Sequence, residues 1–266
     1  HAVSEDGIHF ECSDKPVLAH GEILDGKVVI DPQDPRITRN DDTYYMAYCD
    51  WDLRNCWTAL ASSRDLVRWT NLGAIAPFER FGMNKNAALF SEKIGGRYAM
   101  VFRPEPPQCV NDTTPFCWDR WTKNPDFPGG MRLSFSDDLH TWTYGEDCFL
   151  MPRDGKWDNL KIGIAGPPLK TDAGWLTVYH GVDQNRTYRL GVALLDLNDP
   201  SIVIKRQDEP ILEPELPWER KGDVDGVVFS CGGFLKDGEL WVYYCGADTV
   251  IGAARASAED VRKFLS

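Results

Sequence analysis

The chain has 266 residues, of which 42% are hydrophobic and 12% aromatic, and its formal net charge is −12. This composition predicts a globular chain with a sizeable core, and the acidic balance excludes a nucleic-acid partner, because phosphate-backbone binding needs a basic surface. No apolar run approaches the roughly 20 residues that cross a bilayer, and no signal peptide stands at the start. We therefore expect no membrane partner and a cytoplasmic location.

A short pattern recurs along the chain: Ser, any residue, Asp, three further residues, then an aromatic. It begins at Ser4, Ser63 and Ser136, and weaker echoes follow at Asp196 and Ser257. A period of about 60 residues is typical of four-stranded propeller blades rather than of a short solenoid repeat.

Between these copies lies a second repeat, a hairpin followed by an aromatic-rich strand. The predicted two-residue turns are Asp41–Asp42, Gly95–Gly96, Ala173–Gly174 and Asp237–Gly238. The strands that follow lie at 44–48, 98–102, 175–179 and 240–244. Most of them are apolar along almost their whole length, which favours strands buried on both faces between packed blades.

These repeats predict an all-β fold, a five-bladed β-propeller that forms a single catalytic domain over residues 1–266. Four blades begin near Asp34, Asn86, Gly166 and Val227, and residues 1–20 supply only the outer strands of a first blade that is incomplete at the N-terminus. A capping-box-like start at Ser257 predicts a short C-terminal helix over 257–265. The stretch 105–130 is expected to be a long irregular insertion.

The eight cysteines follow no disulfide framework, so free thiols are expected. Cys109 and Cys117 would be the first candidates for a pair in an oxidising compartment. The five histidines are scattered, and no Cys or His pair has zinc-ligand spacing, so no metal site is predicted.

Polar residues stand at the strand ends that should meet at one mouth of the propeller. Pro35 is expected to mark the start of an inner strand, because proline is confined to strand starts, edges and bulges. In a propeller the start of the first strand and the end of the second share one face. We therefore expect five side chains to surround one opening: Asp34, Arg103, Lys161, His180 and Asp248.

Three cations at one axis of an acidic protein predict a compact anion site, and Asp34 beside it predicts acid chemistry. Inverting glycoside cleavage needs an acid on the leaving oxygen and a second agent that attacks from the opposite face of the sugar. A bound phosphate could be that agent, and the enzyme would then be a phosphorylase.

Several strings resemble glycoside hydrolase family 130 over nearly the whole chain. They are Asp34–Ile37, Lys85–Phe90 with Glu92–Ile94, Trp157–Asp158 with Lys161–Gly163, Gly174–Leu176 with Tyr179–Gly181, Leu194–Asp196 with Asp199–Pro200, and Ala247–Thr249.

This resemblance implies a five-bladed propeller that acts on β-mannosides, as an inverting phosphorylase that releases mannose 1-phosphate. It implies that Asp34 is the general acid and that Asp248 grips the mannose. Arg103, Lys161 and His180 would bind phosphate. Arg36, Asn86 and Tyr179 are also expected to bind substrate.

Two other functions remain open from the sequence. One is an inverting β-mannosidase, in which a carboxylate such as Glu105 activates water; the other is a mannoside-binding propeller without catalytic activity. For the leading hypothesis the partners are a β-mannoside and inorganic phosphate as co-substrate, with no cofactor and a possible homo-oligomer.

Overall fold

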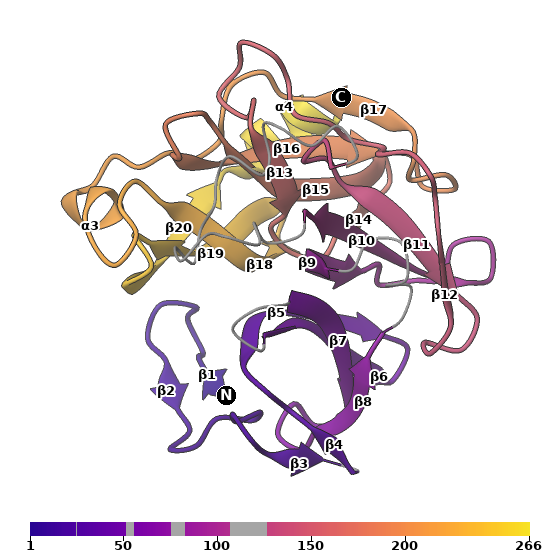
Figure 1. The fold of residues 1–266 in the computed structure, drawn as a ribbon. Coiled ribbons are helices and arrows are strands. Elements are labelled where there is room, and N and C mark those ends of the chain that lie inside the picture. Colours follow the sequence, from indigo (N-terminus) through magenta and orange to yellow (C-terminus); the bar gives the residue numbers. More distant parts are fainter. Residues whose placement is uncertain (25, 52–55, 76–82, 107–126) are drawn as a thin grey trace.

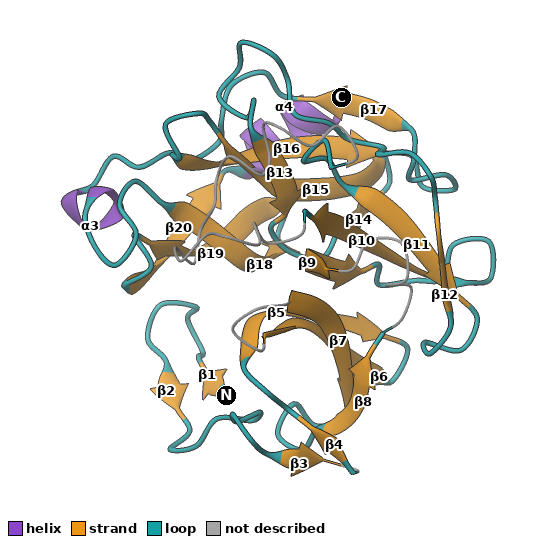
Figure 2. Ribbon diagram, viewed as in Figure 1, coloured by secondary structure: helices purple, strands orange, loops and turns teal. Residues whose placement is uncertain are grey.

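The computed structural model describes residues 1–24, 26–51, 56–75, 83–106 and 127–266. Over these residues the fold is all-β, and four antiparallel sheets form a propeller-like arrangement, each sheet being one blade (Figure 1, Figure 2). The predicted fold class is therefore confirmed for four blades.

The first two blades follow one another in chain order. Blade one contains β5 (Pro32–Asn40), β6 (Thr43–Trp51), β7 (Cys56–Ser63) and β8 (Thr70–Ala74). Blade two contains β9 (Met83–Leu89), β10 (Tyr98–Glu105), β11 (Arg132–Ser136) and β12 (Trp142–Tyr144).

The third blade has an interrupted inner strand. Both β13 (Lys161–Ile164) and β14 (Leu169–Thr171) pair with β15 (Gly174–Val182), which continues to β16 (Tyr188–Leu195) and β17 (Val203–Arg206). Lys161 is thus the first residue of an inner strand, whereas the sequence placed that strand near Gly166.

The fourth blade contains β18 (Val228–Lys236), β19 (Glu239–Gly246) and β20 (Val250–Ala256). The short helix α3 (Pro217–Arg220) precedes it, and helix α4 (Ala258–Leu265) follows it. Ser257 is the N-cap of α4, since its hydroxyl accepts a hydrogen bond from the Asp260 amide at 3.2 Å. Ser257, which the sequence analysis read as a weak copy of the Ser-x-Asp pattern, is therefore a helix cap.

Three of the four predicted hairpin turns lie where the sequence placed them. Asp41, Gly95 and Asp237 each have a positive φ, of 51°, 58° and 54°, as two-residue hairpin turns require. The third turn is shifted by one residue, because Thr171 pairs with Gly174 and leaves Asp172 and Ala173 in the loop.

The Ser-x-Asp repeat is a local turn that recurs between the third and fourth strands of blades one and two. In blade one, Asp65 accepts hydrogen bonds from the amides of Val67 and Arg68, and the indole of Trp69 donates to the Leu66 carbonyl. The same bonds recur in blade two at Asp138 and Trp142. The side chain closes the turn on its own backbone, so the pattern is structural.

The core lies between neighbouring blades. One cluster joins blades one and two through Leu60, Leu89 and Met100, and another joins blades two and three through Val101, Ile162 and Trp175. A third joins blades three and four. Buried stretches of β6, β10 and β15 agree with the predicted two-sided burial.

The corresponding strand of blade four is an exception. Burial alternates along β19, so only one of its faces is fully covered. On the other face Tyr243 donates a hydrogen bond to the Gly7 carbonyl at 2.8 Å, and its ring meets Phe10 edge-on at 5.7 Å. The cover on this side comes from the N-terminal residues.

Those N-terminal residues form two short hairpins, β1 (Ala2–Val3) with β2 (Glu11–Cys12) and β3 (Ile23–Leu24) with β4 (Lys27–Val28). In Figure 1 both lie beside blade one, and the chain begins there. Leu18 and Val29 pack into a cluster on blade one.

Other sequence predictions concern the cysteines and the insertion. The six cysteines within the described residues are free thiols. Cys109, Cys117 and most of the stretch 105–130 lie outside the described residues. Within the described ranges, no helix has the length and apolar character needed to cross a membrane.

Candidate active site

A cavity of about 800 Å³ receives side chains from all four blades. We refer to it as the central cavity. Its lining comprises Gln33, Asp34, Lys85, Asn86, Arg103, Glu105, Lys161, His180, Asn185, Arg186, Tyr188, Val224, Asp225, Val227, Phe229 and Asp248.

The structure brings together the five residues that the strand-end argument selected. Asp34 lies near the start of β5 and Lys161 at the start of β13, Arg103 and His180 lie near the ends of β10 and β15, and Asp248 follows β19. Asn86, on β9, lines the same cavity.

Asp34 and Asn86 are directed by β-bulges. The ladder between β5 and β6 shifts between Gln33 and Arg36, and Asp34 has a φ of 53°. The ladder between β9 and β10 shifts opposite Asn86, whose φ is 56°. Asp and Asn tolerate this left-handed backbone better than most residues, and a bulge re-aims the side chain.

The bulge also corrects the prediction for Pro35. The strand β5 begins at Pro32, so Pro35 lies inside it. The register shift at this point leaves Pro35 without a partner in the ladder, so its lack of an N–H donor breaks no hydrogen bond.

Arg36 holds this bulge from below and does not line the central cavity. Its side chain is buried, with Nη1 donating to the Asp34 carbonyl at 2.9 Å and Nε donating to the Ala165 carbonyl at 3.0 Å. The guanidinium lies 5.7 Å from the ring centre of Phe229. The geometry makes Arg36 a support for Asp34 and gives no sign of the predicted substrate contact.

His180 is a hydrogen-bond acceptor at the centre of the site. Arg103 Nη1 donates to His180 Nε2 at 3.3 Å, and Asn86 Nδ2 lies 3.2 Å from the same nitrogen. Because a guanidinium can only donate, Nε2 carries the lone pair and Nδ1 carries the proton.

The charge of His180 therefore differs from the sequence prediction. Burial, followed by the charges of Arg103, Arg36 and Lys161, lowers the pKa of His180 well below its ordinary value. At neutral pH the imidazole is uncharged, so the predicted trio contains two cations, Arg103 and Lys161. Burial was the property that the sequence did not reveal.

Lys85 supplies a cation that the sequence analysis did not select as a site residue. Burial opposes its charge, but Cys49, Cys56, Glu105 and Asp34 raise the pKa of Lys85 above its ordinary value. Its ammonium lies 5.5 Å from the ring centre of Trp51. Lys85 directly precedes Asn86 and, like Lys161, lies near the start of an inner strand. This position was the sequence signal that could have identified it.

Carboxylates balance these cations. Burial and the nearby charge of Asp34 raise the pKa of Asp248. Glu105 forms a buried ion pair with Arg103, their side chains being 2% and 3% exposed. Four cationic lining residues (Lys85, Arg103, Lys161, Arg186) thus stand against four acidic ones (Asp34, Glu105, Asp225, Asp248).

Aromatic rings form one wall of the central cavity. The ring centre of His180 lies 4.9 Å from that of Phe229 and 5.9 Å from that of Tyr188. Lys161 Nζ lies 5.6 Å from the ring centre of Tyr188. Neither Tyr188 nor Phe229 was selected from the sequence, although Phe229 lies two residues after Val227, the predicted start of the fourth blade.

Tyr179 does not line the central cavity, so its predicted sugar contact is not supported. It precedes His180 on β15, and consecutive side chains of a strand point to opposite faces. Its hydroxyl donates to Asp158 and accepts from Arg206 Nε, each at 3.0 Å.

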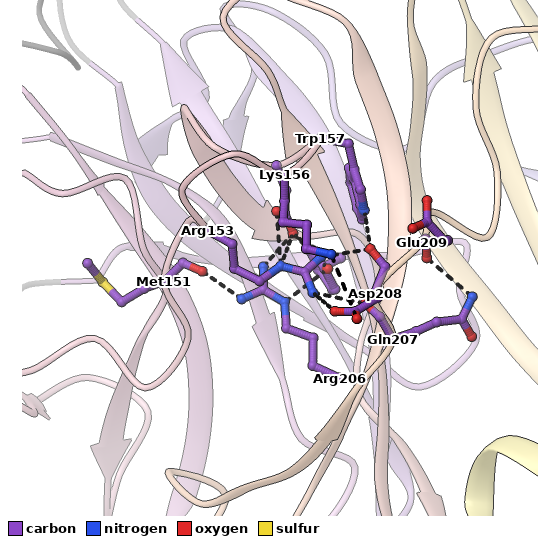
Figure 3. A network of polar contacts seen from close by, with 10 residues as sticks. Met151, Arg153, Lys156, Trp157, Arg206, Gln207, Asp208 and Glu209 are labelled. Carbon is purple, nitrogen blue, oxygen red and sulfur yellow. Dashed lines mark hydrogen bonds and ion pairs between the residues drawn. The ribbon is translucent and has the colours of Figure 1, made fainter.

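Asp158 is the centre of a buried ionic network around Tyr179. Arg153 and Arg206 both pair with its carboxylate, at 2.9 and 2.6 Å. Figure 3 shows how these arginines converge beside Trp157. This network fixes the segment that leads into β13, and thereby the position of Lys161.

The arrangement can bind an anion beside an acid. Cationic side chains and the carboxylates of Asp34 and Asp248 line the same cavity, and its aromatic wall can receive the apolar face of a ring. Among the described residues, no group of three His, Cys, Asp or Glu side chains is placed to hold a metal ion.

Comparison with known proteins places this geometry in context. A family model described as beta-1,4-mannooligosaccharide phosphorylase, for glycoside hydrolases of group 130, matches residues 1–266.

Two relatives come from Thermoanaerobacter sp. (strain X514). A 1,2-beta-oligomannan phosphorylase is 42% identical, covering 98% of this chain and 79% of the relative. A beta-1,2-mannobiose phosphorylase is 46% identical, covering 98% and 78%.

Among solved structures, a beta-1,2-mannobiose phosphorylase from Listeria innocua in complex with beta-1,2-mannobiose superposes with a TM-score of 0.80. It is 32% identical, and the match covers 99% of this chain and 68% of that one.

Proposed function

Because the chain belongs to glycoside hydrolase family 130, as its sequence predicted, we propose that it catalyses the inverting phosphorolysis of β-mannosides to mannose 1-phosphate. The observation that carries this proposal is the meeting of Asp34 with Arg103, Lys161 and Lys85 in one cavity. Direct attack by phosphate requires an acid beside an anion site, and this set of side chains can supply both.

The chemistry follows from these positions. A phosphate oxygen forms a bond to the anomeric carbon while the bond from that carbon to the leaving sugar breaks. Asp34 gives its proton to the leaving oxygen, and the proton that phosphate loses restores Asp34. Arg103 and Lys161 hold the phosphate, and Asp248 with Asn86 holds the mannose.

The names of the relatives bear on the substrate. Two relatives above 40% identity are named for β-1,2-linked mannosides, whereas the family description refers to a β-1,4 linkage. We propose β-1,2-mannobiose or a short β-1,2-oligomannan as the preferred substrate, with β-1,4-mannobiose as the comparison.

Hydrolysis is less well supported. The carboxylate suggested as the base, Glu105, is paired with Arg103, and an ion-paired carboxylate is a weak base for water. A binding module without catalysis would have no need of an acid beside a cluster of cations.

The test is to incubate the purified chain with β-1,2-mannobiose, with and without inorganic phosphate, and to follow products by ¹H NMR. Mannose 1-phosphate should form only with phosphate, and inversion requires that it is the α-anomer. Equal release of mannose without phosphate would refute phosphorolysis and establish a hydrolase.

We also propose that residues 1–20 form the outer part of a fifth blade in a single catalytic domain of residues 1–266. The support is local: Ser4 and Asp6 make the same turn between β1 and β2 that Ser63 and Asp65 make between the third and fourth strands of blade one. The hairpin also covers the outer face of β19 through Gly7 and Phe10.

Two further expectations concern the setting of the enzyme. A cytoplasmic location is supported by the six free thiols, since a reducing compartment keeps cysteines free. A homo-oligomer is supported by apolar side chains on blade four such as Ile251, which is 83% exposed. No cofactor is proposed, and phosphate acts as a co-substrate.

A further inference from the structure

We propose that Glu105 is a positioning residue: its carboxylate holds the guanidinium of Arg103 as a resident counter-anion and so sets the affinity of the site for phosphate. This inference rests on the proposed phosphorolysis and extends it to a residue that does not itself touch the reacting atoms.

The first support is the geometry along β10. Arg103 and Glu105 are two residues apart on one strand, so their side chains emerge on the same face. Arg103 Nη2 donates to Glu105 Oε1, and both side chains are almost completely buried. A buried pair of this kind fixes a long side chain that would otherwise have many rotamers.

The second support is that the other end of the guanidinium is also held. Arg103 Nη1 donates to the Ile162 carbonyl and to His180 Nε2, each at 3.3 Å. Blade two therefore holds one nitrogen of Arg103 and blade three holds the other. The plane of the guanidinium is set before any ligand arrives, which lowers the entropic cost of binding an anion.

The third support is the charge of the central cavity. Its cationic and acidic lining residues are equal in number, and burial keeps His180 neutral. A phosphate dianion that enters must therefore bind Arg103 in the presence of the Glu105 carboxylate, and like charges this close oppose one another. Glu105 orders Arg103 and at the same time weakens phosphate binding.

These two effects can be separated by substitution. Glu105→Gln keeps an oxygen that can accept from Arg103 but removes the charge, so phosphate should bind about tenfold more tightly. Glu105→Ala removes the acceptor as well, and the loosened guanidinium should lower kcat/KM for phosphate by about 100-fold. Glu105→Asp keeps the negative charge on a side chain that is one methylene shorter, so this variant should bind phosphate no more tightly than the wild type.

The experiment is calorimetric titration of inorganic phosphate into the full chain, together with initial rates of mannose 1-phosphate formation at varied phosphate. Glu92→Gln is the matched control, because Glu92 forms a surface ion pair with Lys170 outside the central cavity; phosphate affinity should not change. Thermal melts of every variant identify those that are folded.

Tighter phosphate binding by Glu105→Gln, with the control unchanged, supports the proposal. Unchanged or weaker binding by a folded Glu105→Gln overturns it while leaving phosphorolysis intact. If Glu105→Gln does not fold, tighter binding by Glu105→Asp overturns it, and equal or weaker binding with a reduced kcat supports it. A wild type that neither binds phosphate nor forms sugar phosphate ends the proposed function and this inference together.

Discussion

Replacement of Gly163 by alanine tests whether phosphate binds beside Arg103 and His180, as we propose. Gly163 pairs with His180 across β13 and β15. A Cβ at this position would lie 2.6 Å from His180 Cε1, 2.7 Å from His180 Nε2 and 2.9 Å from Arg103 Nη1. Because ordinary contacts are 3.4–4 Å, the imidazole must move by about 1 Å to make room.

That displacement sets the size of the effect. A misplacement of about 1 Å in a group that orients a reactant can cost roughly 100-fold in rate, which corresponds to about 2.7 kcal/mol of transition-state stabilisation. The backbone of Gly163 does not have a left-handed φ, so alanine introduces no backbone strain there. The loss should therefore arise from the side chains of His180 and Arg103 alone.

The assay is the rate of mannose 1-phosphate formation from β-1,2-mannobiose at varied phosphate. Gly163→Ala should lower kcat/KM for phosphate by about 100-fold. Gly145→Ala is the matched control, because its nearest neighbours, the carbonyl oxygens of Asp147 and Leu133, lie 4.0 Å from the added Cβ. A folded Gly163→Ala enzyme with its kcat/KM for phosphate within about twofold of the wild type would refute the assignment of Arg103 and His180.

Three further outcomes are expected. Asp34→Asn keeps the size of the side chain and suits the left-handed φ at this position, so the fold should persist while kcat on mannobiose falls by about 10²–10⁴-fold; a dinitrophenyl mannoside, whose leaving group needs no proton, should lose much less. The free energy of unfolding, measured by urea titration, should fall as the pH drops below 6.5, the ordinary pKa of histidine. In that pH range His180 binds a proton in the unfolded chain but stays unprotonated when it is buried in the folded chain. The fall should be shallower in His180→Gln. Tyr179→Phe removes hydrogen bonds to Asp158 and Arg206 and should lower the free energy of unfolding by about 1–3 kcal/mol with no change in KM, whereas a raised KM for mannobiose would return Tyr179 to the substrate site.

The site could be predicted from the sequence to the extent that the repeat fixes where strands begin and end. Asp34 and Arg103 are far apart in the chain, yet each occupies a strand end that the propeller brings to the same mouth. The pattern of turns was enough to pair those ends. No contact between side chains was needed for this step, and the repeat therefore located the central cavity correctly.

Properties that depend on packing could not be predicted in this way. The sequence suggests a positive His180, but the uncharged state follows from burial beside Arg103, Arg36 and Lys161. The family resemblance implied that Tyr179 binds substrate, although strand alternation directs it to Asp158. Alternation was visible in the sequence and could have indicated that Tyr179 and His180 face opposite sides of the strand, whereas the degree of burial was not visible.

The bulges explain how similar blades come to carry different chemistry. A regular strand would direct alternate side chains into the packed interfaces between blades, where a carboxylate is costly. At Asp34 and at Asn86 one extra residue with a left-handed φ interrupts the ladder, so the polar side chain reaches the central cavity while its neighbours stay in the core. Blade three has no such shift between β13 and β15, and there Lys161 reaches the cavity as the first residue of β13. The bulges of blades one and two thus each deliver one polar group to the central cavity without loss of the packing between blades, and in blade three the start of a strand does the same.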